Sequence, residues 1–518
     1  MNGSQALITS LVDAGVEVCF MNPGTSEMHF VHALDSVPRM RGVLALFEGV
    51  ATGAADGYAR VAGRPASVLL HLGPGLGNGL ANLHNARRAH TPLLCVVGAH
   101  ATYHARYDAP LESDIASVAR TVSGWVHTSG TTRRVAADAM RALAAAQADG
   151  GQVATLILPA DVSWTEGGQT AAPWPPPPLV PAAASAIAAA TQAVAAGEQT
   201  MLLLGGRGLS AAGLEAASRI AAATGARVLA ETFPARMEGG AGVPATRRLA
   251  YLAEQAEQQL DGVRTLVLAG AAAPVSFFAY PGRTSSLVPD GCEVVLLAET
   301  GQDVAAALEA LADRVAADTA PELAACGPAV PEPGPLNLAN LPAAIASTLP
   351  DGAVVVDEAN TSGLGLPTAL ARAARHTLLT LTGGAIGQGM PVATGAAIAA
   401  PDRAVLNLEA DGSALYTIQS LWTQARERSN ITTVVLNNSA YAILRMELAR
   451  TGASDTPGAA SARMLDLSDP TPDFVHLATG LGVSASRATT AEELADQLTA
   501  AYAEPGPHLI EAIVPPIL

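Results

Sequence analysis

The sequence predicts an α/β protein of three domains, each a mostly parallel sheet flanked by helices. Two observations support this prediction. Short apolar runs alternate with longer segments in which apolar residues recur at three- and four-residue steps, an alternation that is typical of parallel sheets. Two proline-rich stretches, at 173–178 and 328–335, interrupt the alternation and are too stiff for core helices. The 518 residues suffice for three domains of ordinary size.

These stretches divide the chain into five segments. We place an N-terminal domain, a linker, a central domain, a second linker and a C-terminal domain at residues 1–165, 166–184, 185–325, 326–340 and 341–518, respectively. Hydrophobic residues make up 49% of the chain and charged residues only 14%, which indicates extensive burial rather than disorder.

The charge of the chain indicates which kinds of partner it can bind. The formal net charge is −17 and the chain has no run of Lys and Arg, which argues against nucleic acid or an anionic membrane as a partner. The chain does not begin with a basic segment followed by a long apolar core, and it contains no stretch of about 18 apolar residues. We therefore expect a cytoplasmic enzyme that acts on small molecules.

The N-terminal domain opens with the expected alternation. Apolar spacing predicts a helix over 4–14 and a strand over 16–21, and the strand ends in the turn Asn22-Pro23-Gly24-Thr25. A second helix is predicted to begin near Met28.

Polar residues stand at the ends of the next strands of this domain. Strands are predicted over 42–47, 68–70 and 93–97. Glu48 ends the first of them and precedes a helix of small residues over 49–60. His71 stands at the tip of the second, and the glycine-rich segment 72–78 predicts a turn into another helix.

The central domain gives ordinary α/β signals. Its strands are predicted over 200–204, 226–230, 265–269 and 293–297. The glycine-rich segment 205–208 follows the first strand, but it lacks the complete spacing of a dinucleotide-binding loop. A tight turn is therefore favoured over a nucleotide site.

The C-terminal domain repeats the pattern with more polar strand ends. Strands are predicted over 353–356, 404–408 and 431–436. Residues 357–361 follow the first strand, a glycine-rich loop occupies 382–389, and a helix is predicted over 414–425. The strand, helix and strand from 404 to 436 predict a right-handed parallel crossover.

That crossover brings Asp411 and Asn438 to the carboxyl ends of neighbouring strands. A carboxylate and an amide oxygen beside the helix start at Gly412 and Ser413 suit a hard divalent ion, with magnesium favoured, that carries a phosphorylated ligand. Ordinary turn chemistry of the Asp-Gly and Asn-Asn pairs is the alternative explanation.

Three motifs occur together and in one order. They are Asn22-Pro23-Gly24, the segment 48–60, and the Asp-Gly and Asn-Asn dipeptides whose Asp411 and Asn438 are 27 residues apart. Along essentially its whole length the chain resembles thiamin diphosphate enzymes of the acetolactate synthase large-subunit and benzoylformate decarboxylase group. It departs from the usual fingerprint at Ala410, where the family commonly has glycine.

The resemblance implies how the cofactor is held. In that family the first domain binds the aminopyrimidine, the third binds diphosphate and magnesium, and two subunits share each cofactor, so we expect a homodimer or homotetramer. Glu48 matches the glutamate that hydrogen-bonds the pyrimidine ring and promotes removal of the thiazolium proton. Taken alone, Glu48 is explained equally well as a helix-start carboxylate. We expect no catalytic need for FAD, because the central domain lacks a decisive flavin signature.

The resemblance also assigns the residues of the C-terminal half of the site. Gly384 and Ile386 match the loop that receives the aminopyrimidine and enforces the bent cofactor. The remaining assignments are diphosphate contacts from Asn360, Thr361, Gly412 and Ser413, magnesium ligands from Asp411, Asn438 and the backbone oxygen of Ala440, and Tyr441 and Ala442 beneath the phosphates.

The substrate pocket combines features of both enzyme groups. His71 falls where benzoylformate decarboxylases have an active-site histidine, and Thr25 replaces their serine. Their second histidine is expected near 274–280, where this chain offers aromatic residues, so protonation is less assisted and attack on a second carbonyl is an option. Arg445 is kept, but the tryptophan expected two residues later in an acetolactate synthase is absent.

We therefore expect a thiamin diphosphate- and magnesium-dependent enzyme that decarboxylates a small 2-oxo acid, with or without acyl transfer to a second carbonyl. Non-oxidative decarboxylation of the benzoylformate decarboxylase type is the alternative reaction. A cofactor-binding or regulatory homologue without turnover is the alternative class.

Overall fold

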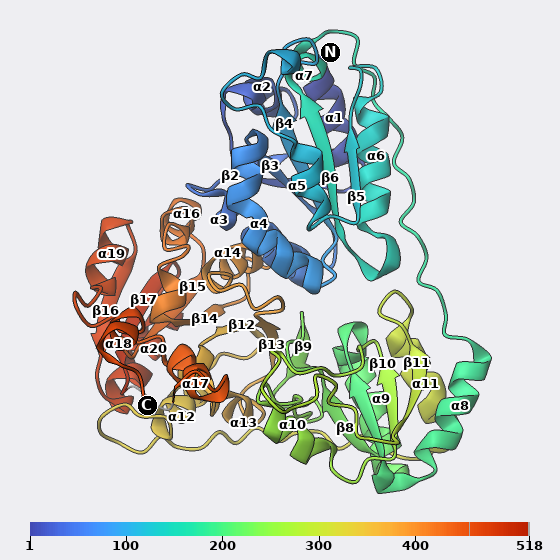
Figure 1. Cartoon of the computed structure of the whole chain (residues 1–518), viewed down its shortest axis with the longest axis vertical. Helices are drawn as coiled ribbons and strands as arrows, with labels where there is room; N and C mark the ends of the chain where they lie inside the picture. The colour runs from blue at the N-terminus through green and yellow to red at the C-terminus, as the bar shows by residue number, and fades with distance from the viewer. Residues whose placement is uncertain (455, 516–518) are drawn as a thin grey trace.

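Three parallel or mostly parallel sheets, each covered by helices, make up the computed structural model, which describes residues 1–454 and 456–515 (Figure 1). The predicted fold class is confirmed. The N-terminal sheet lies at the top of the view, the central sheet at the lower right and the C-terminal sheet at the lower left. No helix in the described ranges has both the length and the apolarity needed to cross a membrane.

The N-terminal sheet has six parallel strands in the order β2-β1-β3-β4-β6-β5. Buried apolar side chains cover both of its faces and form two separate clusters. The strands are β1 Val18–Asn22, β2 Arg41–Leu44, β3 Ala66–Leu70, β4 Leu93–Ala99, β5 Trp125–Thr128 and β6 Val153–Pro159. The helices are α1 Gly3–Asp13, α2 Met28–Ser36, α3 Glu48–Ala62, α4 Leu72–Arg88, α5 Ile115–Arg120, α6 Val135–Ala146 and α7 Ala160–Trp164.

Helix α4 begins earlier than the sequence predicts. The turn expected over 72–78 is wrong, because these residues already form the first turns of the helix. Gly75 in this segment packs against α3, because a Cβ there would lie 3.2 Å from the carboxylate of Glu48. One on Gly79, just beyond the segment, would lie 2.9 Å from the methyl group of Thr52 in α3. Small residues let α4 approach α3 closely.

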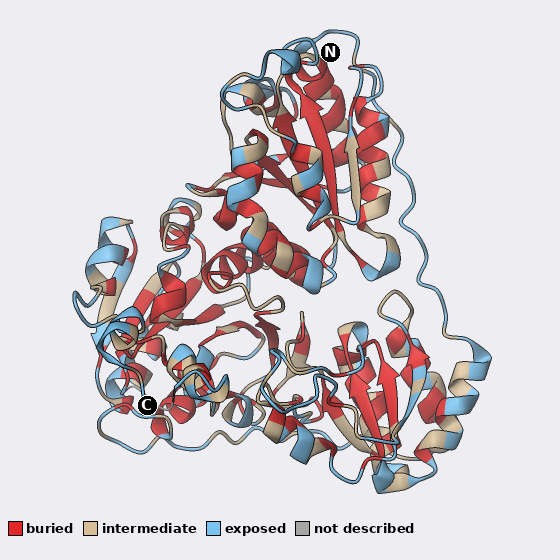
Figure 2. Cartoon of the chain, in the orientation of Figure 1, coloured by how far each residue is buried: buried red, intermediate tan, exposed pale blue. Residues whose placement is uncertain are grey.

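The central sheet has four parallel strands in the order β11-β10-β7-β8. An extended, exposed linker along one side of the molecule connects it to the N-terminal domain (Figure 2). The strands are β7 Thr200–Leu204, β8 Arg227–Ala230, β10 Thr265–Ala269 and β11 Glu293–Ala298, and the helices are α8 Ala184–Val194, α9 Ala211–Thr224, α10 Ala253–Leu260 and α11 Val304–Val315.

The C-terminal sheet has seven strands in the order β16-β17-β15-β14-β12-β13-β9. The short strand β9, Met237–Gly239, comes from the central segment and pairs antiparallel with β13, whereas the other pairs are parallel. The remaining strands are β12 Ala353–Glu358, β13 His376–Thr380, β14 Val405–Ala410, β15 Ile431–Asn437, β16 Ser484–Ala488 and β17 His508–Ile513. The helices are α12 Asn340–Thr348, α13 Leu366–Leu370, α14 Gly389–Ala399, α15 Asp411–Ala414, α16 Ser420–Glu427, α17 Ala442–Arg450, α18 Ala459–Met464, α19 Phe474–Gly480 and α20 Ala491–Ala503.

The helix predicted over 414–425 is wrong in one respect, because the chain leaves the helix between α15 and α16. Within this break the hydroxyl group of Thr417 donates to the carbonyl oxygen of Gly387 at 3.0 Å. The apolar spacing of the segment suggests a continuous helix, but the chain is irregular at the point where it contacts the glycine-rich loop.

Helices α3 and α14 join the N-terminal and C-terminal domains. A Cβ on Gly395 would overlap the carbonyl oxygen of Ala54, and one on Gly57 would overlap that of Val392. The two helix backbones therefore touch, and no larger residue fits at either glycine. This contact sets how the N-terminal domain sits on the loop that precedes α14 (Figure 1).

We expect Gly395→Ala to lower the apparent melting midpoint, because overpacking at a tight helix contact destabilises by about 1–3 kcal/mol. Gly480→Ala is a matched control in helix α19, where a Cβ would meet no atom within 4 Å. Thermal unfolding followed by circular dichroism measures both. Equal midpoints for the two variants would contradict the tight packing.

Candidate active site

Asp411 lies at the junction of strand β14 and helix α15, and its carboxylate reaches the end of the neighbouring strand β15. Its Oδ2 accepts hydrogen bonds from the backbone amides of Asn438 at 3.1 Å and Ser439 at 2.7 Å, and its Oδ1 accepts from Gly412 at 2.8 Å. Strands β14 and β15 are parallel neighbours, as predicted. Burial raises the pKa of Asp411, and the backbone amides that bind it act in the opposite direction.

The oxygen atoms around Asp411 fit a small hard cation. Asn438 is buried, and its Oδ1 accepts from the amide of Ala440 at 3.0 Å while its Nδ2 donates to Ser362 at 3.2 Å. Among the described residues no three His, Cys, Asp or Glu side chains gather into a metal-binding group. Magnesium, which keeps several waters and binds phosphate oxygens, suits one carboxylate, one amide oxygen and the backbone oxygen of Ala440.

The residues predicted to contact diphosphate surround the start of α15. The amide of Asn360 donates to the hydroxyl of Ser413 at 3.0 Å. Asn360 has φ +49° and begins the short 3-10 helix η6, Asn360–Gly363, which also contains the half-buried Thr361. Gly412 lies under the ring of Tyr441, because a Cβ there would overlap that ring. The structure thus brings Asn360, Thr361, Gly412, Ser413, Asp411, Asn438 and Tyr441 to one edge of the sheet, and Ala440 and Ala442 flank Tyr441 in the chain.

The glycine-rich loop 382–389 lies between strand β13 and helix α14. Gly384 and Gly387 have φ of +72° and +89°, which only glycine adopts readily. A Cβ on Gly384 would overlap the ring of Phe277, so the central domain reaches this loop directly. Ile386 is half-buried two residues beyond Gly384.

Phe277 belongs to a cluster of four aromatic residues. Its ring centroid lies 5.8 Å from that of Phe233, 5.3 Å from that of Tyr251 and 4.9 Å from that of Phe278. The sequence indicated aromatics in 274–280, but it gave no signal that Phe233 and Tyr251 join them. The cluster makes the central-domain side of the loop apolar.

Two buried glutamates lie beneath the same loop. Glu358, at the end of β12, accepts hydrogen bonds from the amide of Gly387 at 2.7 Å and from that of Gly389. Burial raises the pKa of Glu358 to about 7, against the amide bonds that lower it. Burial and then the neighbouring Glu358 raise the pKa of Glu409 well above its usual range. Two buried carboxylates on paired strands do not both ionise readily, so burial and proximity favour the protonated form of one of them.

Glu48 and His71 lie in the N-terminal domain. Glu48 begins α3 with only 7% of its surface exposed, and its Oε2 accepts from the amide of Asn78 at 3.0 Å. His71 places its Nδ1 2.7 Å from Oε2 of Glu27, a residue that the sequence reasoning missed. Glu27 also accepts from the amide of Gly24 at 2.9 Å. The spacing Asn-Pro-Gly-x-x-Glu was the available signal.

The Glu27 carboxylate orients the imidazole ring of His71. Because the carboxylate binds Nδ1, the Nε2 atom is left as the nitrogen that can meet a substrate. Glu27 is 1% exposed, and its burial raises its pKa while the contact with His71 lowers it. Thr25 is exposed in the same 3-10 helix, η1 Thr25–Glu27.

The side chain of Asn82 connects the start of α3 to the glycine-rich loop within the chain. The amide of Asn82 donates to the carbonyl oxygen of Gly49 at 2.8 Å and to that of Gly387 at 3.3 Å. The start of α3, which carries Glu48, therefore lies beside the glycine-rich loop.

Comparison with known proteins agrees with this geometry. Models of the N-terminal and C-terminal TPP-binding domains of thiamine pyrophosphate enzymes match residues 1–119 and 363–512. The chain is 61% identical over 519 residues to a Mycobacterium tuberculosis H37Rv protein named "Putative acetolactate synthase large subunit IlvX", with 100% of both chains covered. The chain described here therefore belongs to the thiamine pyrophosphate enzyme family.

Other relatives of this thiamine pyrophosphate enzyme are decarboxylases by name. Benzoylformate decarboxylase of Pseudomonas aeruginosa PAO1 is 28% identical, and the similarity covers 96% of each chain. The solved structure of the thiamine diphosphate-dependent 4-hydroxybenzoylformate decarboxylase of Rhodococcus jostii RHA1 superposes with a TM-score of 0.86 at 24% identity, covering 99% of each chain. That superposition supports the shared fold.

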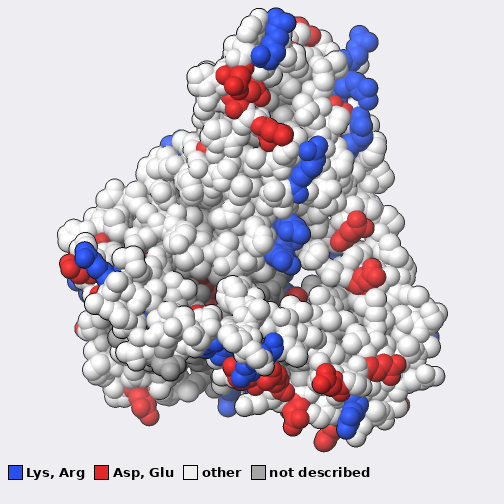
Figure 3. All heavy atoms as spheres, in the orientation of Figure 1, with Lys and Arg blue, Asp and Glu red and all other residues white. Residues whose placement is uncertain are grey.

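A large cleft of about 1890 Å³ lies apart from Asp411, where the three domains face one another. Basic side chains border it in a chain that is acidic as a whole (Figure 3). The arginines that line it include Arg60, Arg87, Arg207, Arg236, Arg375 and Arg403.

The turn predicted after β7 lies at this cleft, and the amide of Gly206 donates to Glu231 at 3.1 Å. Burial raises the pKa of Glu231 to about 7.

We expect Glu231→Gln to reduce the loss of stability between about pH 4.5 and pH 7. The folded chain holds the Glu231 proton up to about pH 7, whereas the unfolded chain releases it near pH 4.5, so this group destabilises the fold as pH rises through that interval. The upper bound is about 3 kcal/mol, and the half-buried carboxyl gives less. Melting midpoints across pH 4.5–8 test this, and parallel curves for the two proteins would contradict it.

Proposed function

We propose that this protein is a thiamin diphosphate- and magnesium-dependent enzyme that decarboxylates a small 2-oxo acid. The observation that carries the proposal is the Asp411 carboxylate, which binds the amides of Asn438 and Ser439 at adjacent strand ends. When bound, thiamin diphosphate supplies the electron sink that a 2-oxo acid needs to lose carbon dioxide. Magnesium would be held by Asp411, Asn438 and the backbone oxygen of Ala440, and it would bind the diphosphate.

The chain's own residues would bind the cofactor and transfer protons. Asn360, Thr361, Gly412, Ser413, Tyr441 and Ala442 would hold the diphosphate, and Gly384 and Ile386 would receive the aminopyrimidine. Glu48 would exchange a proton with the ring nitrogen of the aminopyrimidine, a role supported by its burial at a helix start. His71, oriented by Glu27, would move a proton at the substrate through Nε2, with Thr25 nearby.

Transfer of the acyl carbanion equivalent to a second carbonyl is the second candidate reaction. One observation favours it: the central domain places Phe277 against Gly384, and the aromatic cluster around that ring offers no second histidine. An apolar wall of this kind slows protonation and leaves time for an acceptor to react. The dyad of Glu27 and His71 favours protonation and release of an aldehyde.

We also propose that the enzyme works as a homodimer or homotetramer with sites between subunits. Large apolar side chains are exposed beside both halves of the site: Met28 and Leu46 in the N-terminal domain, and Leu415, Tyr416 and Leu444 in the C-terminal domain. Exposed apolar surface of this kind marks protein interfaces. The acidic surface and the fold give no support for nucleic acid or a membrane as a partner.

Glu48→Gln should slow exchange of the cofactor C2 proton by about 10²–10⁴-fold, the usual contribution of a positioned proton carrier, while cofactor binding persists. Asp411→Ala should abolish magnesium-dependent binding instead, since magnesium has few protein ligands. Proton NMR of the cofactor and calorimetric titration separate the two effects. The proposal would be falsified if wild-type protein bound no thiamin diphosphate in the presence of magnesium.

Product analysis should separate the two reactions. Carbon dioxide release with pyruvate, 2-oxobutyrate and benzoylformate is measured first, and the organic product is then identified by chromatography. A free aldehyde supports decarboxylation with protonation by His71, and His71→Ala should then shift the product toward the acyloin. Cofactor binding without carbon dioxide release from any 2-oxo acid would point to a homologue without turnover.

A further inference from the structure

The glycine-rich loop 382–389 depends on side chains from elsewhere for its shape. It contains two left-handed glycines, Gly384 and Gly387, and belongs to no helix or strand before Gly389. Such a loop gains a single conformation only if its backbone groups find fixed partners. Helix α4 of the N-terminal domain supplies these partners on one side, and Glu358 supplies them on the other.

Asn85 in α4 binds both polar groups of one loop residue. Its Oδ1 accepts from the amide of Ala385 at 3.2 Å, and its Nδ2 donates to the carbonyl oxygen of Ala385 at 2.8 Å. The second hydrogen of Nδ2 goes to Asn82 at 3.0 Å. Asn85 is fully buried, so every hydrogen-bonding group of its side chain is used inside the protein.

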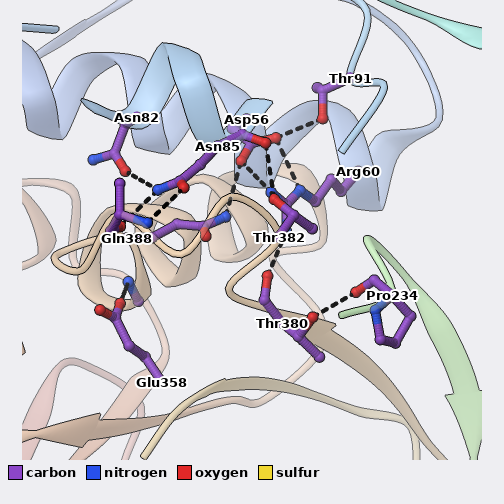
Figure 4. A network of polar contacts seen from close by, with 12 residues as sticks. Asp56, Arg60, Asn82, Asn85, Thr91, Pro234, Glu358, Thr380, Thr382 and Gln388 are labelled. Atoms are coloured by element: carbon purple, nitrogen blue, oxygen red, sulfur yellow. Dashed lines mark hydrogen bonds and ion pairs between the residues drawn. The ribbon is translucent and has the colours of Figure 1, made fainter. Parts of the chain in front are cut away.

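Neighbouring contacts hold the same loop and Asn85 itself (Figure 4). The hydroxyl of Thr382 donates to the backbone oxygen of Asn85 at 2.8 Å. Arg60 donates to that hydroxyl and to the carbonyl oxygen of Thr380, both at 3.0 Å, and its guanidinium is paired with the buried Asp56. A Cβ on Gly383 would overlap Oδ1 of Asn85, so the loop backbone lies directly against α4.

The neighbour of Ala385 is left open. Among the described residues, the carbonyl oxygen of Gly384 accepts no hydrogen bond, although the loop around it is heavily bonded. This carbonyl belongs to the same planar peptide unit as the Ala385 amide, which Asn85 fixes, so it is a preorganised acceptor for a donor on a ligand. The amino group of an aminopyrimidine is such a donor.

We propose that Asn85 is a positioning residue that presents the Gly384 carbonyl oxygen to the aminopyrimidine by fixing the peptide of Ala385 from the N-terminal domain of the same chain. This inference rests on the proposed function for the identity of the ligand. Asn85 touches neither cofactor nor substrate. It acts by shaping the loop before the ligand arrives, and it thereby makes cofactor affinity depend on how α4 packs against the C-terminal domain.

Hydrogen exchange in the full-length protein without cofactor tests the loop directly. Asn85→Ala leaves the amide and carbonyl of Ala385 without partners, so peptides covering 383–387 should exchange about tenfold faster or more. Asn340→Ala is the matched control, because Asn340 is also a buried amide that bonds backbone groups, here of residues 332–337. It should leave exchange in 383–387 unchanged.

Cofactor binding tests whether the fixed loop matters for affinity. Asn85→Ala should raise the Kd for thiamin diphosphate, measured with magnesium by calorimetry, by about tenfold or more. At saturating cofactor kcat should stay within about threefold of wild type, because no group that touches the reacting atoms is changed. Asn85→Asp keeps the acceptor for the Ala385 amide but turns an oxygen toward the carbonyl oxygen of Ala385 and Oδ1 of Asn82, so it should raise the Kd at least as much as the alanine variant does.

Each outcome decides the proposal. Unchanged hydrogen exchange in 383–387 would show that Asn85 does not fix the loop. Faster exchange with unchanged cofactor affinity overturns its role in positioning the ring. If wild-type protein binds no thiamin diphosphate, the proposed function fails. The exchange measurement still tests independently whether Asn85 fixes the loop.

Discussion

The close contact between helices α3 and α14 is the constraint on which the rest of the site depends. It exists because Gly57 and Gly395 have no side chains, so that each helix backbone can touch the other. Once these helices are packed, the start of α3 with Glu48 comes beside the glycine-rich loop, and Asn82 bonds both. A larger side chain at either glycine would separate the start of α3 from the glycine-rich loop of the same chain.

The glycine-rich loop shows how backbone without regular structure is held in a buried place. Amides of Gly387 and Gly389 donate to the buried carboxylate of Glu358, and the other side of the loop is held by side-chain amides of α4. Both supports are buried, which strengthens each hydrogen bond and makes each loss severe. Within residues 1–454 and 456–515, no donor bonds the carbonyl oxygen of Gly384, and such an acceptor suits a site that is formed before its ligand binds.

Local patterns predicted much of the fold. The strands at 200–204 and 265–269 occur as predicted, and the crossover from β14 to β15 is parallel. Elements were misplaced where packing changed the meaning of a residue type. The glycine-rich segment 72–78 suggested a turn but begins helix α4, where Gly75 packs against α3. The segment 414–425 suggested one helix but is interrupted where Thr417 bonds Gly387.

The sequence by itself determined the fold class, the family motifs and the adjacency of Asp411 and Asn438, because apolar periodicity and the geometry of a parallel crossover are local properties. Only the tertiary structure decided which distant side chains meet. Glu27 orients His71 across 44 residues, Asn85 binds Ala385 across 300, and Phe277 reaches Gly384 from another domain. Glu27 meets His71 only when the N-terminal sheet assembles, and the other two contacts form only when two domains pack together.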